Sequence, residues 1–127
     1  MNKKIISSEK IPAAIGPYSP AVKVGKFIFI SGQLPIEPES GNLVKGDIKK
    51  QTRQILENLT VILELYSLNL GNVVKTTVFL KNMDDFSEFN KAYAQYFTEK
   101  FPARSCVEVA RLPKDAEIEI EAMAICD

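Results

Sequence analysis

The hydrophobic period of the chain changes near residue 47, and no other sequence feature constrains the fold as strongly. From Asp47 onward, core-type side chains recur at helical spacing over roughly five to six turns, with charged side chains between them. Asp47 can cap the start of this helix, and Gly71 lies just past its end. The buried face is expected to contain Ile48, Thr52, Ile55, Leu59, Ile62, Leu63 and Tyr66.

Short segments rich in β-branched and aromatic residues surround this helix and predict strands. The expected strands are residues 3–7, 21–24, 26–32, 72–81, 105–111 and 117–126. A second helix begins at Asp84 or Asp85, within residues 83–100, and its aromatic stripe is expected to lie in the core. That stripe consists of Phe86, Phe89, Tyr93 and Phe97. The element order β-β-β-α-β-α-β-β predicts an α+β fold, a mixed β-sheet with both helices packed on one face.

Composition limits the classes of function that the chain can have. Its 127 residues predict a single domain spanning residues 1–127. Lys+Arg and Asp+Glu both number 16, so the chain lacks the positive field that favours nucleic-acid binding. The first residues lack the apolar core of a secretory signal, and no apolar run approaches the ~20 residues of a membrane span. We therefore expect a cytoplasmic protein with no membrane partner.

The absence of histidine is the most informative count, because it excludes histidine-based triads and the usual zinc sites. Acid–base chemistry must then use carboxylate, tyrosine, lysine, thiol, backbone or water. Cys106 and Cys126 form neither a disulfide framework nor a metal-binding pair, and reduced, buried thiols are the ordinary interpretation.

The last expected strand is apolar on both faces towards its end. Ile118, Ile120, Ala122, Ala124 and Cys126 form one face, whereas the other begins with glutamates and becomes apolar at Met123 and Ile125. A strand that is apolar on both faces favours burial against another subunit.

Alternation places Arg104, which directly precedes the expected strand 105–111, on the same face as Cys106 and Glu108 of that strand. The same rule places Glu117, Glu119 and Glu121 on one face of the strand that we expect beside it. Two interpretations fit this spacing. The charges could form ion pairs on a wet sheet surface, each worth ~0–1 kcal/mol. Alternatively, the arginine could hold a substrate carboxylate through two parallel hydrogen bonds.

Four stretches resemble the RidA (YjgF) family of reactive intermediate deaminases over nearly the whole chain. They are AAIGPYSPAV, FISGQLP, VVKTTVFLKNMDDFSEFN and FPARSCVEVARLPKDAEIEIEA. The resemblance implies a chorismate-mutase-like fold and a homotrimer with sites between subunits. It also implies hydrolysis of 2-aminoacrylate and 2-iminobutanoate to 2-keto acids and ammonia, with no cofactor and no metal. The connector before Phe101 looks shorter than in bacterial relatives, which could alter the rim of the cleft.

By resemblance, two residues are catalytic: Arg104 binds the substrate carboxylate and Glu119 positions or activates the attacking water. The resemblance also implies pocket positions for Tyr18, Ser31, Gly32, Asn90 and Cys106. Structural alternatives stay open for several of these. Gly32 could allow a β-bulge, Tyr18 could be a tyrosine at the edge of the core, and Asn90 could tie a loop to the backbone.

Two other functions remain open. A non-catalytic module that binds small carboxylates or keto acids would need the same arginine but no work from Glu119. An endoribonuclease or translation inhibitor is disfavoured by the charge balance, the lack of histidine and the lack of a basic aromatic surface.

Overall fold

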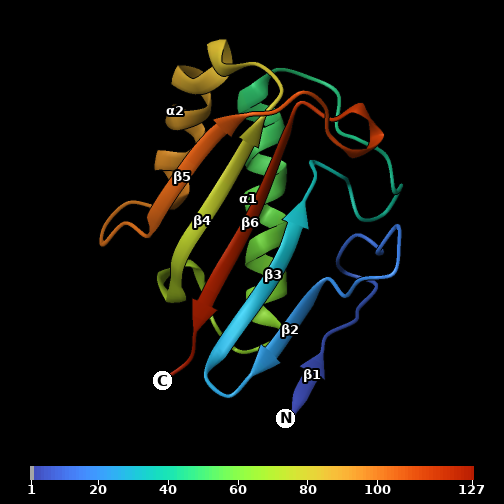
Figure 1. Ribbon diagram of the computed structural model, residues 1–127, viewed down its shortest axis with the longest axis vertical. Helices are drawn as coiled ribbons and strands as arrows, with labels where there is room; N and C mark the ends of the chain where they lie inside the picture. Colours follow the sequence, from blue (N-terminus) through green and yellow to red (C-terminus); the bar gives the residue numbers. More distant parts are fainter. Residues whose placement is uncertain (1) are drawn as a thin grey trace.

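One six-stranded sheet and two α-helices make up most of the regular structure of residues 2–127, which the computed structural model describes (Figure 1). The strands are β1 (Lys3–Ile5), β2 (Ala21–Val24), β3 (Phe27–Gln33), β4 (Val73–Leu80), β5 (Ala103–Glu108) and β6 (Ile118–Ile125). The helices are α1 (Ile48–Glu64) and α2 (Phe86–Tyr96). The element order and the α+β class that the sequence predicted are confirmed.

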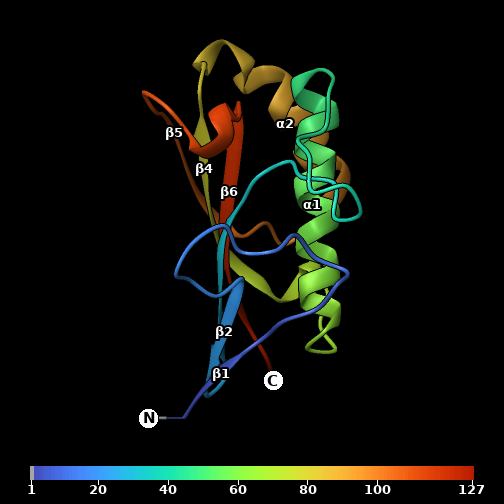
Figure 2. The same cartoon turned by 90° about the vertical axis from the view of Figure 1, so that its right-hand side faces the viewer.

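Both helices cover the same face of the sheet, as the side view in Figure 2 shows. Asp47 caps α1 as expected, because its Oδ1 accepts a hydrogen bond of 2.9 Å from the Lys50 backbone N–H. The apolar side of α1 supplies Ile55, Leu59 and Ile62, all fully buried, to the core between helices and sheet. Within residues 2–127, no helix is both long and apolar enough to cross a bilayer.

The sheet is mixed because β4 and β5 are parallel whereas the other paired strands are antiparallel. Two parallel neighbours need a crossover connection, and α2 supplies it between β4 and β5. This crossover brings α2 back over the helix-side face of β4 and β5. The side chains of β5 that point to this face therefore meet α2.

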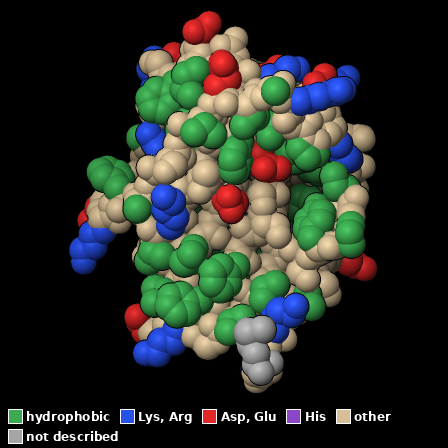
Figure 3. Space-filling view, in the orientation of Figure 1, with side chains coloured by type: hydrophobic (Ala, Val, Ile, Leu, Met, Phe, Trp, Pro, Cys, Tyr) green, Lys and Arg blue, Asp and Glu red, His purple; other side chains and the backbone are tan. Residues whose placement is uncertain are grey.

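Within residues 2–127, no α-helix covers the opposite face of the sheet, which we call the open face (Figure 2). Phe27 and Phe29 of β3 and Val107 of β5 are 47%, 45% and 44% exposed there. Met123 and Ile125 of β6 are only partly buried, so β6 is apolar on both faces at its end, as predicted. Figure 3 shows apolar side chains over the lower part of this face and carboxylates near its centre.

The strand order corrects one expectation about neighbours. The sheet runs β1-β2-β3-β6-β4-β5, so β4 lies between β5 and β6. The sequence had predicted that β5 and β6 are adjacent, and this prediction is wrong. A second correction concerns Glu117. It precedes β6, and its Oε2 accepts a hydrogen bond from Gln51 of α1 at 3.1 Å. Glu117 therefore faces the helices and does not share a face with Glu119.

Candidate functional site

Strand register places Arg104 and Cys106 on the helix-side face of the sheet. Arg104 pairs with Thr76 of β4 and Cys106 pairs with Val78. Thr76 and Val78 are both fully buried beneath the helices. Because side chains paired across two strands point to the same face, Arg104 and Cys106 also point towards α2.

Glu119 lies on the open face, on the other side of the sheet from Arg104. It pairs with Phe79 of β4, whose neighbours in sequence, Val78 and Leu80, are fully buried on the helix side. Alternation then directs Phe79 and Glu119 away from the helices. The sheet thus separates Arg104 from Glu119 within one chain. An ion pair between these two side chains, one of the interpretations that the sequence allows, cannot form in one chain.

The guanidinium of Arg104 is surrounded by aromatic rings of α2. Its Cζ lies 4.9 Å from the ring centroid of Tyr93, 5.3 Å from that of Phe89 and 5.5 Å from that of Phe86. Within residues 2–127, Arg104 forms no salt bridge, and its side chain makes no hydrogen bond. A partly buried guanidinium with unused N–H donors is suited to binding an anion.

Cys106 follows Arg104 by two residues on the same face of β5, and Asn90 lies on the side of α2 that carries Phe86 and Tyr93. We call Arg104, Cys106 and Asn90 the arginine cluster. Cys106 is partly buried, and desolvation raises the pKa of its thiol, although Arg104 opposes the shift. A protonated thiol is a poor nucleophile. Asn90 lies on α2 between Phe86 and Tyr93, four residues after the first and three before the second. The tie to backbone that we had considered for Asn90 is not seen, because its side chain makes no hydrogen bond to residues 2–127.

Gly32 and Glu119 touch each other on the open face. The register between β3 and β6 shifts between Ile30 and Gln33, so the bulge that we considered for Gly32 is present. A Cβ atom on Gly32 would lie 2.6 Å from Glu119 Cδ and 2.7 Å from Glu119 Oε2. Gly32 therefore leaves the space that the Glu119 carboxylate occupies.

Ser31 and Tyr18 belong to the same region, and with Gly32 and Glu119 they form what we call the acidic cluster. The Ser31 hydroxyl donates to the Ser19 carbonyl at 2.6 Å, and the Ser31 N–H donates to the Pro20 carbonyl at 3.0 Å. These two bonds fix the loop before β2 against β3. The loop thereby places Tyr18, 46% exposed, beside Gly32.

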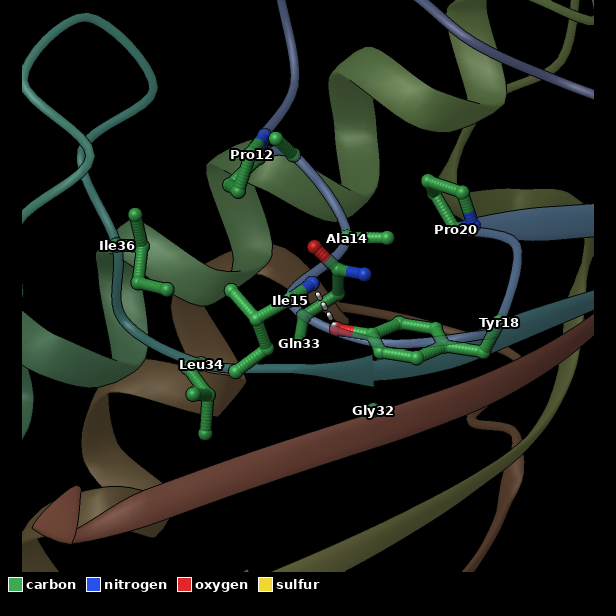
Figure 4. A pocket seen from close by; sticks show the side chains of 10 residues that line it. Pro12, Ala14, Ile15, Tyr18, Pro20, Gly32, Gln33, Leu34 and Ile36 are labelled. Atoms are coloured by element: carbon green, nitrogen blue, oxygen red, sulfur yellow. Dashed lines mark hydrogen bonds between the residues drawn. The ribbon is translucent and has the colours of Figure 1, made fainter. Parts of the chain in front are cut away.

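A small pocket lies between this loop and the end of β3 (Figure 4). It is lined by Pro12, Ala13, Ala14, Ile15, Tyr18, Pro20, Gly32, Gln33, Leu34 and Ile36. The Tyr18 hydroxyl accepts a hydrogen bond of 3.3 Å from the Ile15 N–H, which holds the ring across the pocket. Tyr18 thus lines a pocket and remains largely outside the core.

Burial changes the acidity of Glu119. Desolvation raises the pKa of its carboxyl above the usual glutamate range, and the negative charge of Glu121 raises it further. A carboxylate with a raised pKa accepts a proton more readily than an ordinary glutamate, which suits it to act on water.

Sequence reasoning missed one part of this region. The aromatic stripe of α2 was predicted as core, and Phe89, Tyr93 and Phe97 are indeed buried. Three of its four rings also surround Arg104, a contact that the pattern of α2 alone could not reveal. The order strand–helix–strand could have indicated this contact. If the two strands are parallel neighbours, the helix between them must return over the second strand.

Comparison with known proteins identifies the family of this chain. Residues 8–126 match the family model described as endoribonuclease L-PSP. A RutC family protein of Pyrococcus horikoshii is 57% identical, over 96% of this chain and 97% of its own. A 2-iminobutanoate/2-iminopropanoate deaminase of Escherichia coli K12 is 52% identical, also over 96% of this chain and 97% of its own.

Solved structures agree as well. The structure of E. coli TdcF with bound serine is 43% identical and superposes with a TM-score of 0.92, over 98% of this chain and 99% of that one. Such a score confirms the chorismate-mutase-like α+β fold that the resemblance implied. On the family model, the relatives and the fold together, the chain belongs to the RidA (YjgF) family.

Proposed function

We propose that this protein hydrolyses reactive 2-imino acids, such as 2-iminobutanoate and the imine form of 2-aminoacrylate, to 2-keto acids and ammonia. The observation that carries the proposal is the Arg104 guanidinium, partly buried among aromatic rings and without an ion pair among residues 2–127. A small carboxylate fits such a site because two N–H donors can bind its two oxygens. The deaminase relative with 52% identity supports the choice of substrate.

The reaction needs little chemical machinery. An imine carbon is electrophilic, and water adds to it to form a C–O bond. The C–N bond then breaks, the nitrogen leaves as ammonia with the protons it gains, and the oxygen remains as the keto group. We assign carboxylate binding to Arg104 and orientation and deprotonation of the water to Glu119. Neither role requires a metal or a covalent nucleophile.

We further propose that each reaction site forms between two copies of the chain. In one chain the sheet separates Arg104 from Glu119, so the two side chains cannot reach the same small substrate. The arginine cluster of one copy, with Asn90 and Cys106, would then face the acidic cluster of a second copy, with Tyr18, Ser31 and Gly32. The uncovered apolar side chains of the open face supply a surface for such contacts, and we expect the homotrimer that the family resemblance implies.

A direct assay tests the proposed activity. A serine dehydratase generates 2-aminoacrylate in situ, and pyruvate release is followed with and without the protein. We expect the protein to accelerate pyruvate release, and we expect Arg104→Ala to abolish the acceleration. Arg111→Ala is the matched control, because the Arg111 side chain is 80% exposed and its only ion pair within residues 2–127 is a 3.9 Å contact with Asp115.

The alternative is a non-catalytic module that binds small carboxylates. The serine in the TdcF structure shows that this relative binds a small carboxylate ligand. Glu119→Gln distinguishes the two functions. If the protein is a deaminase, this variant loses turnover and keeps 2-ketobutyrate binding, whereas a binding module has no turnover for the variant to lose. If the unmodified protein binds 2-ketobutyrate and does not accelerate pyruvate release, the binding module is the correct function.

A further inference from the structure

The aromatic rings around Arg104 are arranged as a cradle, which we define as Phe86, Phe89 and Tyr93. The three residues fall at i, i+3 and i+7 on α2, so they share the side of the helix that faces β5. Their ring centroids lie 5.5, 5.3 and 4.9 Å from Arg104 Cζ. Each contact is within the range over which a guanidinium is attracted to an aromatic ring, about 6 Å.

The cradle leaves the hydrogen-bonding edge of the guanidinium free. The five N–H donors of an arginine lie in the guanidinium plane, whereas attraction to a ring engages the positive charge without using a donor. Within residues 2–127, no carboxylate or carbonyl accepts a hydrogen bond from the Arg104 guanidinium. The rings thus hold the charge in place and leave its donors for an incoming anion.

The rings themselves are held firmly. Phe89 is fully buried and Tyr93 is 6% exposed. The Tyr93 hydroxyl lies 2.8 Å from the hydroxyl of Thr76, a fully buried residue that pairs with Arg104 across β4 and β5. Because Thr76 anchors Tyr93 to the strand next to Arg104, the cradle and the arginine are fixed to the same part of the sheet.

We propose that Phe86, Phe89 and Tyr93 are positioning residues that hold the guanidinium of Arg104 ready to bind a substrate carboxylate. This inference rests on the proposed function only in taking the bound anion to be the substrate. An arginine side chain that is already ordered loses less conformational freedom when it binds. The cradle therefore acts on substrate binding and leaves the chemical step unchanged.

Phe86 is the ring best suited to a test, because it is only partly buried and lies at the start of α2. Phe86→Leu removes the ring and keeps most of the apolar volume, whereas Phe86→Tyr keeps the ring. Tyr96→Leu is the matched control: Tyr96 is also an aromatic residue of α2, but its hydroxyl donates to Glu57 of α1 at 2.6 Å, and its ring does not contact Arg104.

The first measurement needs neither substrate nor activity. The Nε–Hε resonance of Arg104, assigned by its loss in Arg104→Lys, reports the ring currents at the guanidinium in the unliganded protein. We expect an upfield-displaced resonance in the unmodified protein and in Phe86→Tyr and Tyr96→Leu. In Phe86→Leu we expect it to move towards the position of an exposed arginine.

The second measurement combines calorimetric binding of 2-ketobutyrate with imine hydrolysis. For Phe86→Leu we expect the Kd and the KM to rise about three- to tenfold, as the loss of one cation–π contact implies, with kcat changed less than about twofold. Phe86→Tyr should restore both constants. Phe86→Met removes the same ring and replaces Phe86→Leu if circular dichroism shows that the leucine variant is unfolded.

Two results would overturn the cradle: an Arg104 resonance that Phe86→Leu leaves in place, or a loss of kcat with unchanged binding of 2-ketobutyrate. Failure of the proposed function looks different. A protein that binds 2-ketobutyrate through a ring-shifted arginine, but does not hydrolyse imines, supports the cradle and refutes the deaminase.

Discussion

Glu119 shows how neighbouring residues set the chemistry of a single side chain. Burial and the charge of Glu121 raise the pKa of its carboxyl, so the folded protein binds this proton more tightly than the unfolded chain does. Ionisation of Glu119 therefore lowers the stability of the fold as pH rises from the ordinary glutamate value, about 4.3, through the raised one. A carboxylate whose ionisation lowers the stability of the fold is more often found at a functional site than on an ordinary surface.

The first prediction concerns the pH dependence of activity. A base must be ionised to act, so kcat/KM should fall at low pH with an apparent pKa above the ordinary value for glutamate, about 4.3. Glu121→Gln removes a nearby negative charge, which lowers the pKa of Glu119 and should move this acid limb to lower pH. Glu64→Gln, at an exposed position of α1, should leave the limb unchanged. A limb that moves to higher pH in Glu121→Gln would contradict the role of Glu119 as the base.

At the scale of elements, the pairing of β3 with β6 determines where the Glu119 carboxylate lies. The bulge between Ile30 and Gln33 places Gly32 directly against the Glu119 side chain. The same bulge brings Ser31 to the loop before β2, where its hydroxyl binds the Ser19 carbonyl. One irregularity in a strand thus positions both the glutamate and the loop that carries Tyr18.

The second prediction follows from the space at Gly32. In Gly32→Ala, the new methyl group would lie 2.6 Å from Glu119 Cδ, so the glutamate side chain must move. Because that side chain is flexible, we expect thermal unfolding to change little, whereas kcat falls and 2-ketobutyrate binding is kept. Gly32→Ala in a Glu119→Gln background should lower kcat no further. Additive losses in the double variant would show that Gly32 acts independently of Glu119.

For the whole molecule, the decisive feature is that the sheet divides the candidate site residues into two clusters. The arginine cluster faces α2, and the acidic cluster lies on the open face. The residues of both clusters are partly accessible to solvent. The open face also carries apolar side chains that no other part of residues 2–127 covers. Assembly of copies would explain both features together.

The third prediction tests that assembly by complementation. Arg104→Ala and Glu119→Gln should each be inactive alone, but co-expressed chains should regain on the order of a quarter of the activity through random mixing in a cyclic oligomer. The regained sites combine an intact arginine cluster from one chain with an intact acidic cluster from another.

Co-expression of Arg104→Ala with Asn90→Ala is the control for this experiment. Both changes lie in the arginine cluster, so every mixed site keeps one defect and activity should not rise above that of the single variants. Recovery in the control, or none in the test pair, would refute a site shared between chains.

Local patterns in the sequence were sufficient to predict the elements and the class of the fold. The spacing of Ile55, Leu59 and Ile62 indicated α1, and the cap at Asp47 was correct, because helical period and capping depend on residues close in sequence. Alternation likewise identified the two apolar faces of β6. The resemblance supplied the family, which the comparisons confirmed.

Strand order, and with it the face on which each candidate residue lies, was decided by the tertiary structure. The sequence placed β5 and β6 side by side, whereas β4 lies between them, and Glu117 turned out to face Gln51 of α1. Alternation states which residues of one strand share a face, but only pairing relates that face to those of other strands. The separation of Arg104 from Glu119, and the rings around Arg104, arise from contacts between segments far apart in the chain. Such contacts follow from how the whole chain packs its core, which no local pattern encodes.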